Sequence, residues 1–236
     1  MSVVESQNSE LPRGLTPAEL AGGFGLPDAM ALSGRIEENF QQRVDALPKQ
    51  TQLLLLVAAA EPVGDPALVR RAAERIGLSV EAPGSTEAAG LLELGARVRF
   101  RHPLVRSAVY RAAALTDRRS AHAALAKVTD PEVDPDRRAW HLAQAVAGPD
   151  EDVAAELERS AGRAQARGGL AAAAAFLERS AELTLDPARR GRRALDAAQA
   201  TFQAGAFDPA LVLLATAEAG PLDDLARARI DLLRAQ

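Results

Sequence analysis

Residues 167–177 read RGGLAAAAAFL, and the same order of features returns 37 residues further on, where residues 204–214 read AGAFDPALVLL. In each copy a glycine-containing turn follows a long helical pattern and precedes a second helix that begins with small residues. A repeat of this length and order is typical of helical hairpins that stack side by side, because each hairpin buries its apolar face against the next. The repeat predicts a helical array over residues 116–236.

The composition indicates a mainly α-helical fold. Alanine and leucine dominate, aromatic residues make up only 3% of the chain, and the hydrophobic fraction of 47% is ample for a packed core. This favours helices that pack through small side chains over β-sheets, which use β-branched and aromatic residues. The hairpins are therefore predicted to be tetratricopeptide-like, with a degenerate hairpin around Trp140. Stacked repeats usually number three or more and end in a polar cap, so we expect this array to be incomplete.

The composition also limits where the protein acts. Cysteine is absent, which excludes disulfides and thiolate metal sites and fits a reducing cytoplasm. The apolar runs at 53–60 and 170–177 fall short of the roughly 20 residues that span a bilayer. The N-terminus lacks the basic start and apolar core of a secretory signal. We expect a cytoplasmic protein without membrane contact, and the net charge of −4 argues against broad nucleic-acid affinity.

The N-terminal part divides into a linker and a compact domain. Residues 1–35 are rich in glycine, proline and serine and are predicted to be an extended linker, with a one-turn helix that begins in the capping box at 16–19. Residues 36–115 are predicted to form a short winged-helix-like domain. Its expected elements are helices from Arg35 to Pro48, through 53–57, from Asp65 to Gly77 and over 88–94, a strand over 97–101, and a helix that resumes at Leu104 and reaches Tyr110.

Motifs of catalysis are missing from the sequence. Neither lysine follows a glycine, so the phosphate-binding loop G-x-x-x-x-G-K-[ST] is absent, as are the G-x-S-x-G and H-E-x-x-H motifs. We therefore expect no catalytic residue and no enzymatic activity in the isolated chain.

The three histidines, His102, His122 and His141, do not indicate a metal site. None of them lies four residues from another, the spacing that places two ligands on one helix face. His122 is interpreted as a partly buried helix histidine. His141 follows the sole tryptophan, Trp140, and the two are interpreted as anchors of a contact between helices.

One stretch of the chain is strongly basic. Residues 95–116 carry five arginines and no acidic residue between them. Four of these are predicted to form an anion-binding site: Arg97, Arg99, Arg101 and Arg106. The alternative interpretation is that the strand arginines pair with acidic helices, such as the one that carries Glu37 and Glu38. Nucleotide phosphate and DNA are the anions that such a site would bind.

Three segments carry a resemblance to a known family. Residues 11–20 read LPRGLTPAEL, residues 100–110 read FRHPLVRSAVY, and residues 136–142 read DRRAWHL. Together they resemble the middle of the large ATP-binding LuxR-type transcription regulators, which belong to the STAND class of signal-transduction NTPases. Members of that family contain a P-loop ATPase, a winged-helix segment, tetratricopeptide-like repeats and a C-terminal helix-turn-helix that binds DNA.

The resemblance implies which parts of the family this chain contains. It covers the winged-helix region and the first repeats, so the chain is expected to be a fragment or the product of a truncated gene. ATP or ADP is implied only for the full-length family, and DNA contact only through a domain that is not present here; no cofactor is expected in this chain. The setting of His102 resembles the MHD-type motif, whose histidine contacts the β-phosphate of ADP, although Pro103 occupies the aspartate position.

A histidine at the start of a helix is also physically suited to bind an anion, because free backbone N–H groups and the helix dipole meet there. His102 is therefore a candidate nucleotide-binding residue in a full-length context. The alternative is that His102 only forms a hydrogen bond within its own turn.

The sequence leads to one functional hypothesis and two alternatives. The leading hypothesis is a regulatory or coupling module of a signal-responsive transcription regulator, with protein partners or self-association through the helical repeats. The first alternative is a small helical enzyme with a pocket near His102 and His141. The second is a free-standing helical-repeat adaptor that binds a protein.

The end of the chain carries an apolar helix with no predicted neighbour. Its apolar residues are Leu225, Ile230, Leu232 and Leu233. Exposed apolar faces of repeats tend to associate, so we expect self-association, or a swapped or tightly packed final helix.

Overall fold

The computed structural model describes residues 34–78 and 90–235. In this part the chain is mainly helical with a single two-stranded sheet, which confirms the predicted fold class. The elements are α2 (Gly34–Asp45), α3 (Lys49–Ala60), α4 (Pro66–Arg75), β1 (Leu92–Leu94), β2 (Val98–Phe100), α6 (Pro103–Ala112), α7 (Leu115–Val128), α8 (Pro135–Ala145), α9 (Glu151–Ala166), α10 (Leu170–Glu182), α11 (Pro187–Gln203), α12 (Phe207–Glu218) and α13 (Asp224–Arg234). The linker predicted for 1–35 lies outside the described residues, except that its last two residues begin α2, and the predicted helix at 16–19 lies wholly outside them.

Aspartate followed by proline starts several of the helices. The Asp65 side chain accepts from Ala67 N and Leu68 N at the start of α4, and the side chains of Asp134 and Asp186 cap α8 and α11 in the same way. A carboxylate at this position satisfies backbone N–H groups that have no partner within the helix, and proline fits the first turn because it has no N–H to satisfy. The helix start predicted at Asp65 is confirmed.

The two strands form an antiparallel hairpin in which Leu92 pairs with Phe100 and Leu94 with Val98. The strand predicted over 97–101 is therefore confirmed. The helix predicted over 88–94 is wrong where the structure describes it, because Leu92–Leu94 is β1. A short apolar run fits a helix or a strand equally well, and here the adjacent strand supplies the hydrogen bonds that decide between them.

A glycine holds the hairpin against the turn between α3 and α4. Val98 N donates to the carbonyl oxygen of Gly64 over 2.8 Å. Gly64 has a φ of 75°, and a Cβ at this position would overlap the carbonyl oxygen of Val98. Only glycine combines this left-handed conformation with so close an approach of two backbones.

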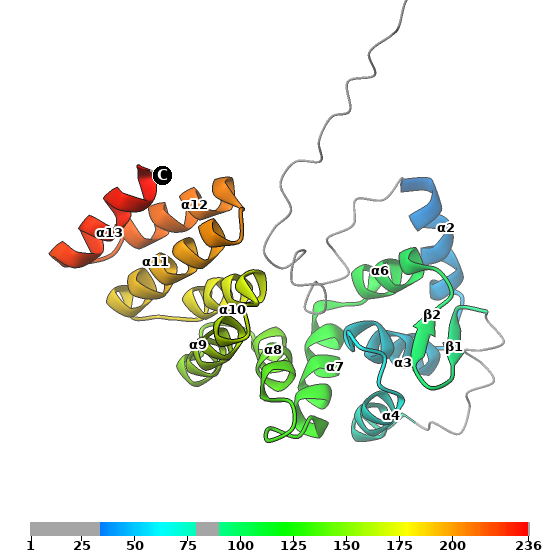
Figure 1. The fold of residues 1–236 in the computed structure, drawn as a ribbon. Helices are drawn as coiled ribbons and strands as arrows, with labels where there is room; N and C mark the ends of the chain where they lie inside the picture. Colours follow the sequence, from blue (N-terminus) through cyan, green and yellow to red (C-terminus); the bar gives the residue numbers. More distant parts are fainter. Residues whose placement is uncertain (1–33, 79–89, 236) are drawn as a thin grey trace, which may run out of the picture.

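The apolar side chains form two cores that meet between α7 and α8. The first contains residues from α2, α3, α4, the hairpin, α6 and α7, whereas the second contains residues from α8 to α13. We call residues 34–128 the N-terminal unit and residues 135–234 the repeat array. Figure 1 shows the N-terminal unit on one side and the repeat array on the other, with α7 and α8 next to each other between them. The domain boundary predicted near 115 stays a prediction, although α7 contributes its apolar face to the first core.

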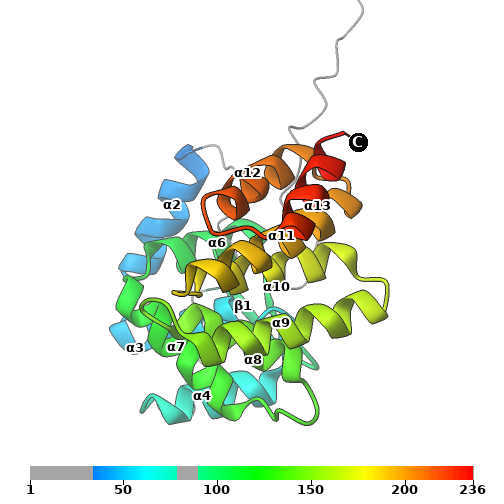
Figure 2. The same cartoon turned by 90° about the vertical axis from the view of Figure 1, so that its left-hand side faces the viewer.

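The repeat array is built from helices that pack in chain order. Helix α10 packs against α9 and α11, and α11 packs against α12. Helix α13 lies over α11, as Figure 2 shows, and buries Ile230 there. The final helix is therefore packed through Ile230, with Ala226 and Leu233 partly buried against the same core, whereas Leu225 and Leu232 are exposed. None of the described helices has the length and the apolar character needed to cross a membrane.

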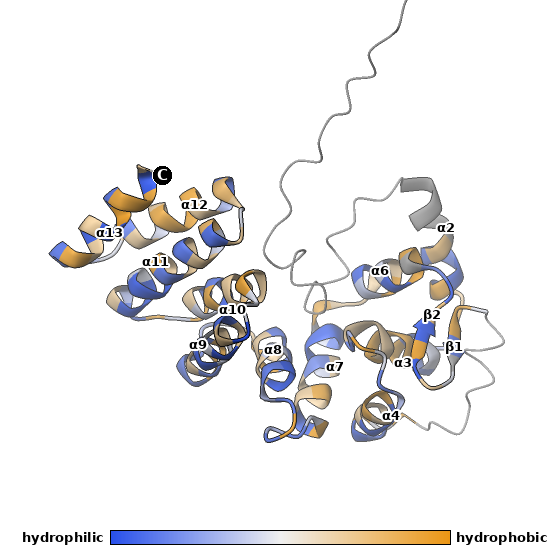
Figure 3. Cartoon of the chain, in the orientation of Figure 1, coloured by the Kyte–Doolittle hydropathy of each residue, from blue (hydrophilic) through white to orange (hydrophobic). Residues whose placement is uncertain are grey.

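One helix carries exposed apolar residues on its outer face. Phe207, Leu211 and Val212 on α12 are all more than half exposed. Figure 3 shows α12 as one of the more hydrophobic helices at this end of the repeat array.

Candidate coupling junction and repeat groove

His102 lies at the start of α6, where its side chain forms a local cap. Its Nδ1 atom accepts from the backbone N–H of Leu104 over 3.2 Å, and its ring lies 5.6 Å from the ring of Phe40 on α2. The side chain is exposed. The hydrogen bond within its own turn that the sequence left as an alternative is therefore present, and it occupies the ring nitrogen nearest the helix start.

The four arginines of the predicted anion site have different surroundings. Arg97, Arg99 and Arg101 are exposed on the hairpin. Arg101 pairs with Glu93 across the two strands, with 3.6 Å between Nε and the nearer carboxylate oxygen. The side chains of Glu37 and Glu38, the partners proposed from the sequence, lie outside the described residues.

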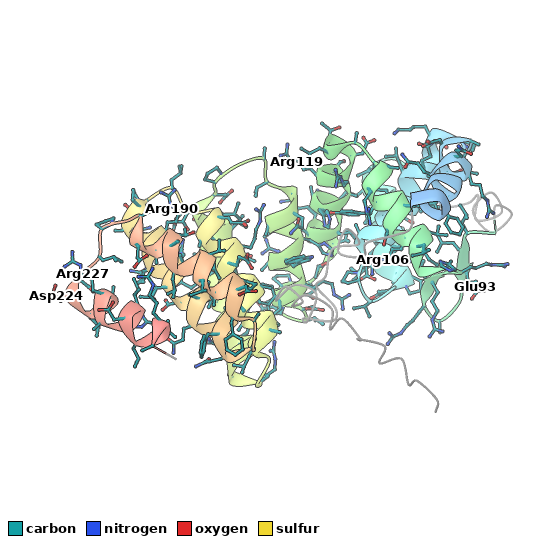
Figure 4. The ribbon with its side chains drawn as sticks, turned by 90° about the horizontal axis from the view of Figure 1, so that it is seen from above. Glu93, Arg106, Arg119, Arg190, Asp224 and Arg227 are labelled. Atoms are coloured by element: carbon teal, nitrogen blue, oxygen red, sulfur yellow. The ribbon has the colours of Figure 1, made fainter. Side chains whose placement is uncertain are left out.

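The side chain of Arg106 is directed to the backbone of α3 and not to the surface of the hairpin. Its Nε atom donates to the carbonyl oxygen of Ala59 in the last turn of α3 over 2.9 Å. Burial lowers the pKa of the guanidinium, an effect that the negative charge of Glu61 opposes. Figure 4 shows Glu93 at the outer edge of the molecule and Arg106 nearer its body. Arg106 therefore ties α6 to α3 and does not extend the row of hairpin arginines.

Three aromatic side chains form a buried hydrogen-bonded chain where the two cores meet. The hydroxyl of Tyr110 on α6 lies 2.8 Å from Nε2 of His122 on α7, and His122 Nδ1 lies 2.9 Å from Nδ1 of His141 on α8. His122 and His141 are 1% and 0% exposed, and Tyr110 is also buried. We call these three residues the histidine junction. Because α7 belongs to the first core and α8 to the second, it links the N-terminal unit to the repeat array.

Both histidines of the junction are held in the neutral form. Burial lowers the pKa of His122 to about 3, and the positive charge of Arg118 acts in the same direction. Burial also lowers the pKa of His141 well below its usual value, with further contributions from His122 and Arg137. An imidazolium in an apolar site loses its hydration without gaining a counter-charge, so the proton binds less readily there than in water.

An ion pair joins the same two parts of the protein. Arg137 on α8 donates from Nη1 to Oε1 of Glu61, the residue after α3, over 3.2 Å. The Glu61 side chain is fully buried, and its Oε2 atom accepts from the backbone N–H of Asp65 over 2.8 Å. Arg137 also lies 2.9 Å from the carboxylate of Asp134. A single buried carboxylate thus binds both the turn between α3 and α4 and the first helix of the repeat array.

A groove runs across the first helices of the successive hairpins. One hollow of about 280 Å³ is lined by residues of α9, α10 and α11, and a second of about 240 Å³ is lined by residues of α11 and α13. Gln199 and Gln203 line both, so the two hollows adjoin. The groove is polar near Glu158 and Gln165 and more apolar towards α13, where its lining residues are Phe202, Leu232 and Leu233.

Arginines fix the polar groups of this groove. Arg229 on α13 donates to Asp196 over 2.9 Å and to Gln199 over 2.6 Å, both on α11. Arg193 on α11, which is almost fully buried, donates to Glu158 on α9 over 2.9 Å. These charge-assisted bonds hold three successive first helices in a fixed relation, so the groove is a preformed surface.

The sequence identified the histidines of the junction but not their partnership. His122 was predicted to be partly buried and is fully buried. The two histidines lie 19 positions apart on successive helices, so no local spacing predicts their contact. The available signal is that each histidine is close in sequence to buried alanines, Ala121 and Ala124 for His122 and Ala139 and Ala143 for His141.

The enzyme alternative requires His102 and His141 to line one pocket, and the structure separates them, since His141 is fully buried and His102 is exposed. In the described residues no group of three or more histidine, aspartate or glutamate side chains is placed to hold a metal ion.

Scans against models of known protein families, against curated proteins and against solved structures found nothing that matches this chain.

Proposed function

We propose that this chain is a coupling module of a signal-responsive transcription regulator of the ATP-binding LuxR type, without catalytic activity of its own. In this proposal the N-terminal unit corresponds to the winged-helix region and the repeat array to the first tetratricopeptide-like repeats. The groove across α9, α11 and α13 receives a segment of a protein partner. The histidine junction and the Glu61–Arg137 pair then connect the state of the array to the N-terminal unit. DNA and nucleotide would be bound by domains outside this chain.

The observation that carries the proposal is the continuity of buried polar contacts between the two cores. A module that only linked two independent domains would need no buried bonds between them, because a flexible connection suffices. Here two separate sets of contacts, one aromatic and one ionic, join α8 to α3, α6 and α7. A buried polar group without its partner costs free energy, so a displacement of α8 cannot leave the N-terminal unit unaffected.

The groove can be tested with a displayed library of random peptides selected on the whole immobilised chain. We expect enriched peptides that bind in solution and change the emission of Trp140, the sole tryptophan, which lies on α8 next to His141. Gln203→Phe fills the groove at one of the two residues shared by its hollows and should weaken binding by about tenfold or more, equivalent to about 1.4 kcal/mol.

Arg190→Phe is the matched control. Arg190 lies exposed on the same helix and is not among the residues that line the groove; Figure 4 labels its position. Its replacement should leave peptide affinity unchanged. Failure to enrich any peptide, or equal affinity for wild type and Gln203→Phe, contradicts the proposed partner site. Binding that leaves Trp140 emission unchanged contradicts transmission to the junction.

The exposed apolar residues of α12 favour self-association as a second mode of partnership, because Phe207, Leu211 and Val212 lie on one side of one helix. Analytical ultracentrifugation of wild type and of Leu211→Ser over a range of concentrations measures whether the chain self-associates through α12. Association that persists in Leu211→Ser contradicts this second mode and leaves the groove proposal as it stands.

A further inference from the structure

The two hydrogen bonds of the histidine junction need one proton each, and two neutral imidazoles together with the Tyr110 hydroxyl supply three. In the gap between the two Nδ1 atoms, 2.9 Å wide, only one of the two imidazoles can carry a proton. If His122 donates there, its Nε2 atom accepts from the Tyr110 hydroxyl; if His141 donates, His122 Nε2 donates to that hydroxyl instead. Both arrangements satisfy His122 completely.

His141 differs because one of its ring nitrogens is left over. Its Nε2 atom is buried, and no described polar atom lies within hydrogen-bond distance of it. One added proton turns one imidazole into a cation, and a second one places an N–H on both Nδ1 atoms, which then face each other across 2.9 Å without an acceptor. Either result places a positive charge in an apolar site, and the second also breaks the hydrogen bond between the two rings, which is costly.

The charged groups around the pair do not supply a counter-charge. Arg118 on α7 and Arg137 on α8 both oppose a positive charge on the histidines. On α6, Tyr110 is the hydrogen-bond partner and Arg106 is turned to Ala59. After α3, the Glu61 carboxylate is bound to Arg137 and to Asp65 N.

The charged side chains of the other helices that pack against α7 and α8 are either exposed or already paired with another residue. The charged residues of α4, which packs against α7, are exposed: Arg70, Arg71, Glu74 and Arg75. Lys49 on α3 bonds Asp117 at the surface, and Glu156 on α9 is bound by Arg138. The pair is therefore enclosed by cations and by carboxylates that are already engaged.

We infer that the histidine junction is an acid-sensitive contact, and that proton uptake by His122 and His141 separates the repeat array from the N-terminal unit at the α7–α8 interface. The closed state requires two neutral imidazoles. In the open state both rings reach water and bind protons readily. The inference concerns the junction alone and does not depend on what the groove binds.

Proton linkage gives the size of the effect. Imidazoles in water have a pKa of about 6.5, so two of them bind close to two protons in the open state below about pH 5.5. The equilibrium between open and closed states then changes by up to about 100-fold for each unit of pH, or about tenfold if only one histidine takes part.

Single-molecule energy transfer can measure this equilibrium, because the chain has no native cysteine and labels can be placed at will. Arg71→Cys on α4 and Arg190→Cys on α11 place one dye on each side of the junction, both at exposed positions. As the pH falls from about 7.5 to 4.5, a range that spans the ordinary histidine pKa, we expect a second population with a different transfer efficiency to grow. The far-UV circular dichroism should stay unchanged over the same range.

Three variants make the test specific. His141→Asn keeps a hydrogen-bonding group near the Nδ1 position but cannot titrate, so it should reduce the steepness to about tenfold per pH unit at most. Tyr110→Phe leaves both histidines in place and should retain the acid response. His102→Gln removes the exposed histidine and should behave as wild type.

If His141→Asn fails to fold, the NMR signals of the imidazole rings in the unmodified chain report the protonation of each histidine directly. The signals can be told apart because the chain has only three histidines. His122 and His141 should remain neutral in the closed population throughout this range. A single population at every pH, an unchanged steepness in His141→Asn, titration of either buried imidazole without separation, or loss of helical signal together with separation would each overturn the inference.

Discussion

Arg137 on α8 donates to Glu61 over 3.2 Å, and this bond brings together two residues that are 76 positions apart in the chain. Glu61 follows a helix whose second half is entirely buried, and its own side chain is fully buried. This buried contact therefore lies at the point where the repeat array begins.

Removal of the Glu61 carboxylate should be strongly destabilising. Glu61→Ala leaves the mostly buried Arg137 without its buried counter-charge and removes the acceptor for Asp65 N, so we expect a loss of about 3–5 kcal/mol in the free energy of unfolding. Urea denaturation followed by Trp140 fluorescence measures this. Glu74→Ala removes an exposed pair with Arg70 and should cost less than about 1 kcal/mol. Equal losses for the two variants would show that the buried pair has no special role.

Gly64 should tolerate no side chain. Gly64→Ala places a methyl group against the carbonyl oxygen of Val98 and also forces alanine into a left-handed conformation, so we expect a loss of well over about 2 kcal/mol. Gly77 has a similar φ but open space around the added Cβ. Gly77→Ala should therefore cost only the conformational strain of about 1–2 kcal/mol. Thermal unfolding of the two variants compares the effects, and a smaller loss for Gly64→Ala would contradict the packing of the hairpin on the turn.

Asp136 gives a prediction about acid stability. Burial tends to raise its pKa, but hydrogen bonds from Arg167 and Arg163 outweigh burial and hold the pKa of this carboxyl below its ordinary value. A carboxyl with a lowered pKa stabilises the fold above the pKa of the unfolded chain, about 3.9, and this contribution disappears as the pH falls through the lower, folded value.

Asp136→Asn should therefore lower the free energy of unfolding by about 1–3 kcal/mol at neutral pH, because two bonds between α8 and α9 lose their charge. The difference from wild type should shrink below about pH 4. Denaturation at the two pH values tests both statements. Asp152→Asn, at an exposed position in the first turn of α9, serves as control, with an expected loss of about 0.3–1 kcal/mol. A difference at Asp136 that is equal at both pH values would contradict the assignment.

Helix α13 should be the least stable part of the repeat array. Ile230 is its one fully buried apolar residue, so Ile230→Ala removes the main apolar contact that, together with the bonds of Arg229 to Asp196 and Gln199, holds α13 on α11. We expect hydrogen exchange of α13 to accelerate by about tenfold or more, which corresponds to about 1.4 kcal/mol, while α9 and α10 keep their protection. Exchange that accelerates equally in all three helices would show that the array unfolds as one unit.

Much of the helical architecture could be predicted because its signals are local. Asp-Pro pairs start helices through bonds that span two or three residues, and the 37-residue offset places α10 and α12 at matching positions, from Leu170 and Phe207. The strand over 97–101 was found from its alternation. Its partner at Leu92–Leu94 was not, because a run of three residues has no period and is specified by its neighbour alone.

The junction could not be predicted because every contact in it is long-range. Tyr110, His122 and His141 come from three helices, and Arg137, on the same helix as His141, binds Glu61, which lies 76 positions earlier in the chain. Arg106 also has a long-range partner that the sequence does not indicate. The sequence groups it with the other arginines of an anion site, whereas in the structure it donates to the carbonyl oxygen of Ala59 at the end of α3. Charge patterns identify which residues need partners, and only packing determines which partners they obtain.

The central claim is that the repeat array and the N-terminal unit respond to each other. Native-state hydrogen exchange of Leu157→Ala tests it most directly. Leu157 lies fully buried on α9, in the second core, and is absent from the first. A large-to-small change at such a site costs about 2–5 kcal/mol. Leu214→Ala, buried on α12 at the far end of the array, is the matched control.

The account predicts that Leu157→Ala accelerates exchange not only in α8–α10 but also in α3, α6 and α7, by about tenfold or more, whereas Leu214→Ala affects α11–α13 and leaves α3 and α6 protected. Faster exchange confined to α8–α12 in the Leu157→Ala variant, with α3, α6 and α7 at wild-type rates, would contradict the account.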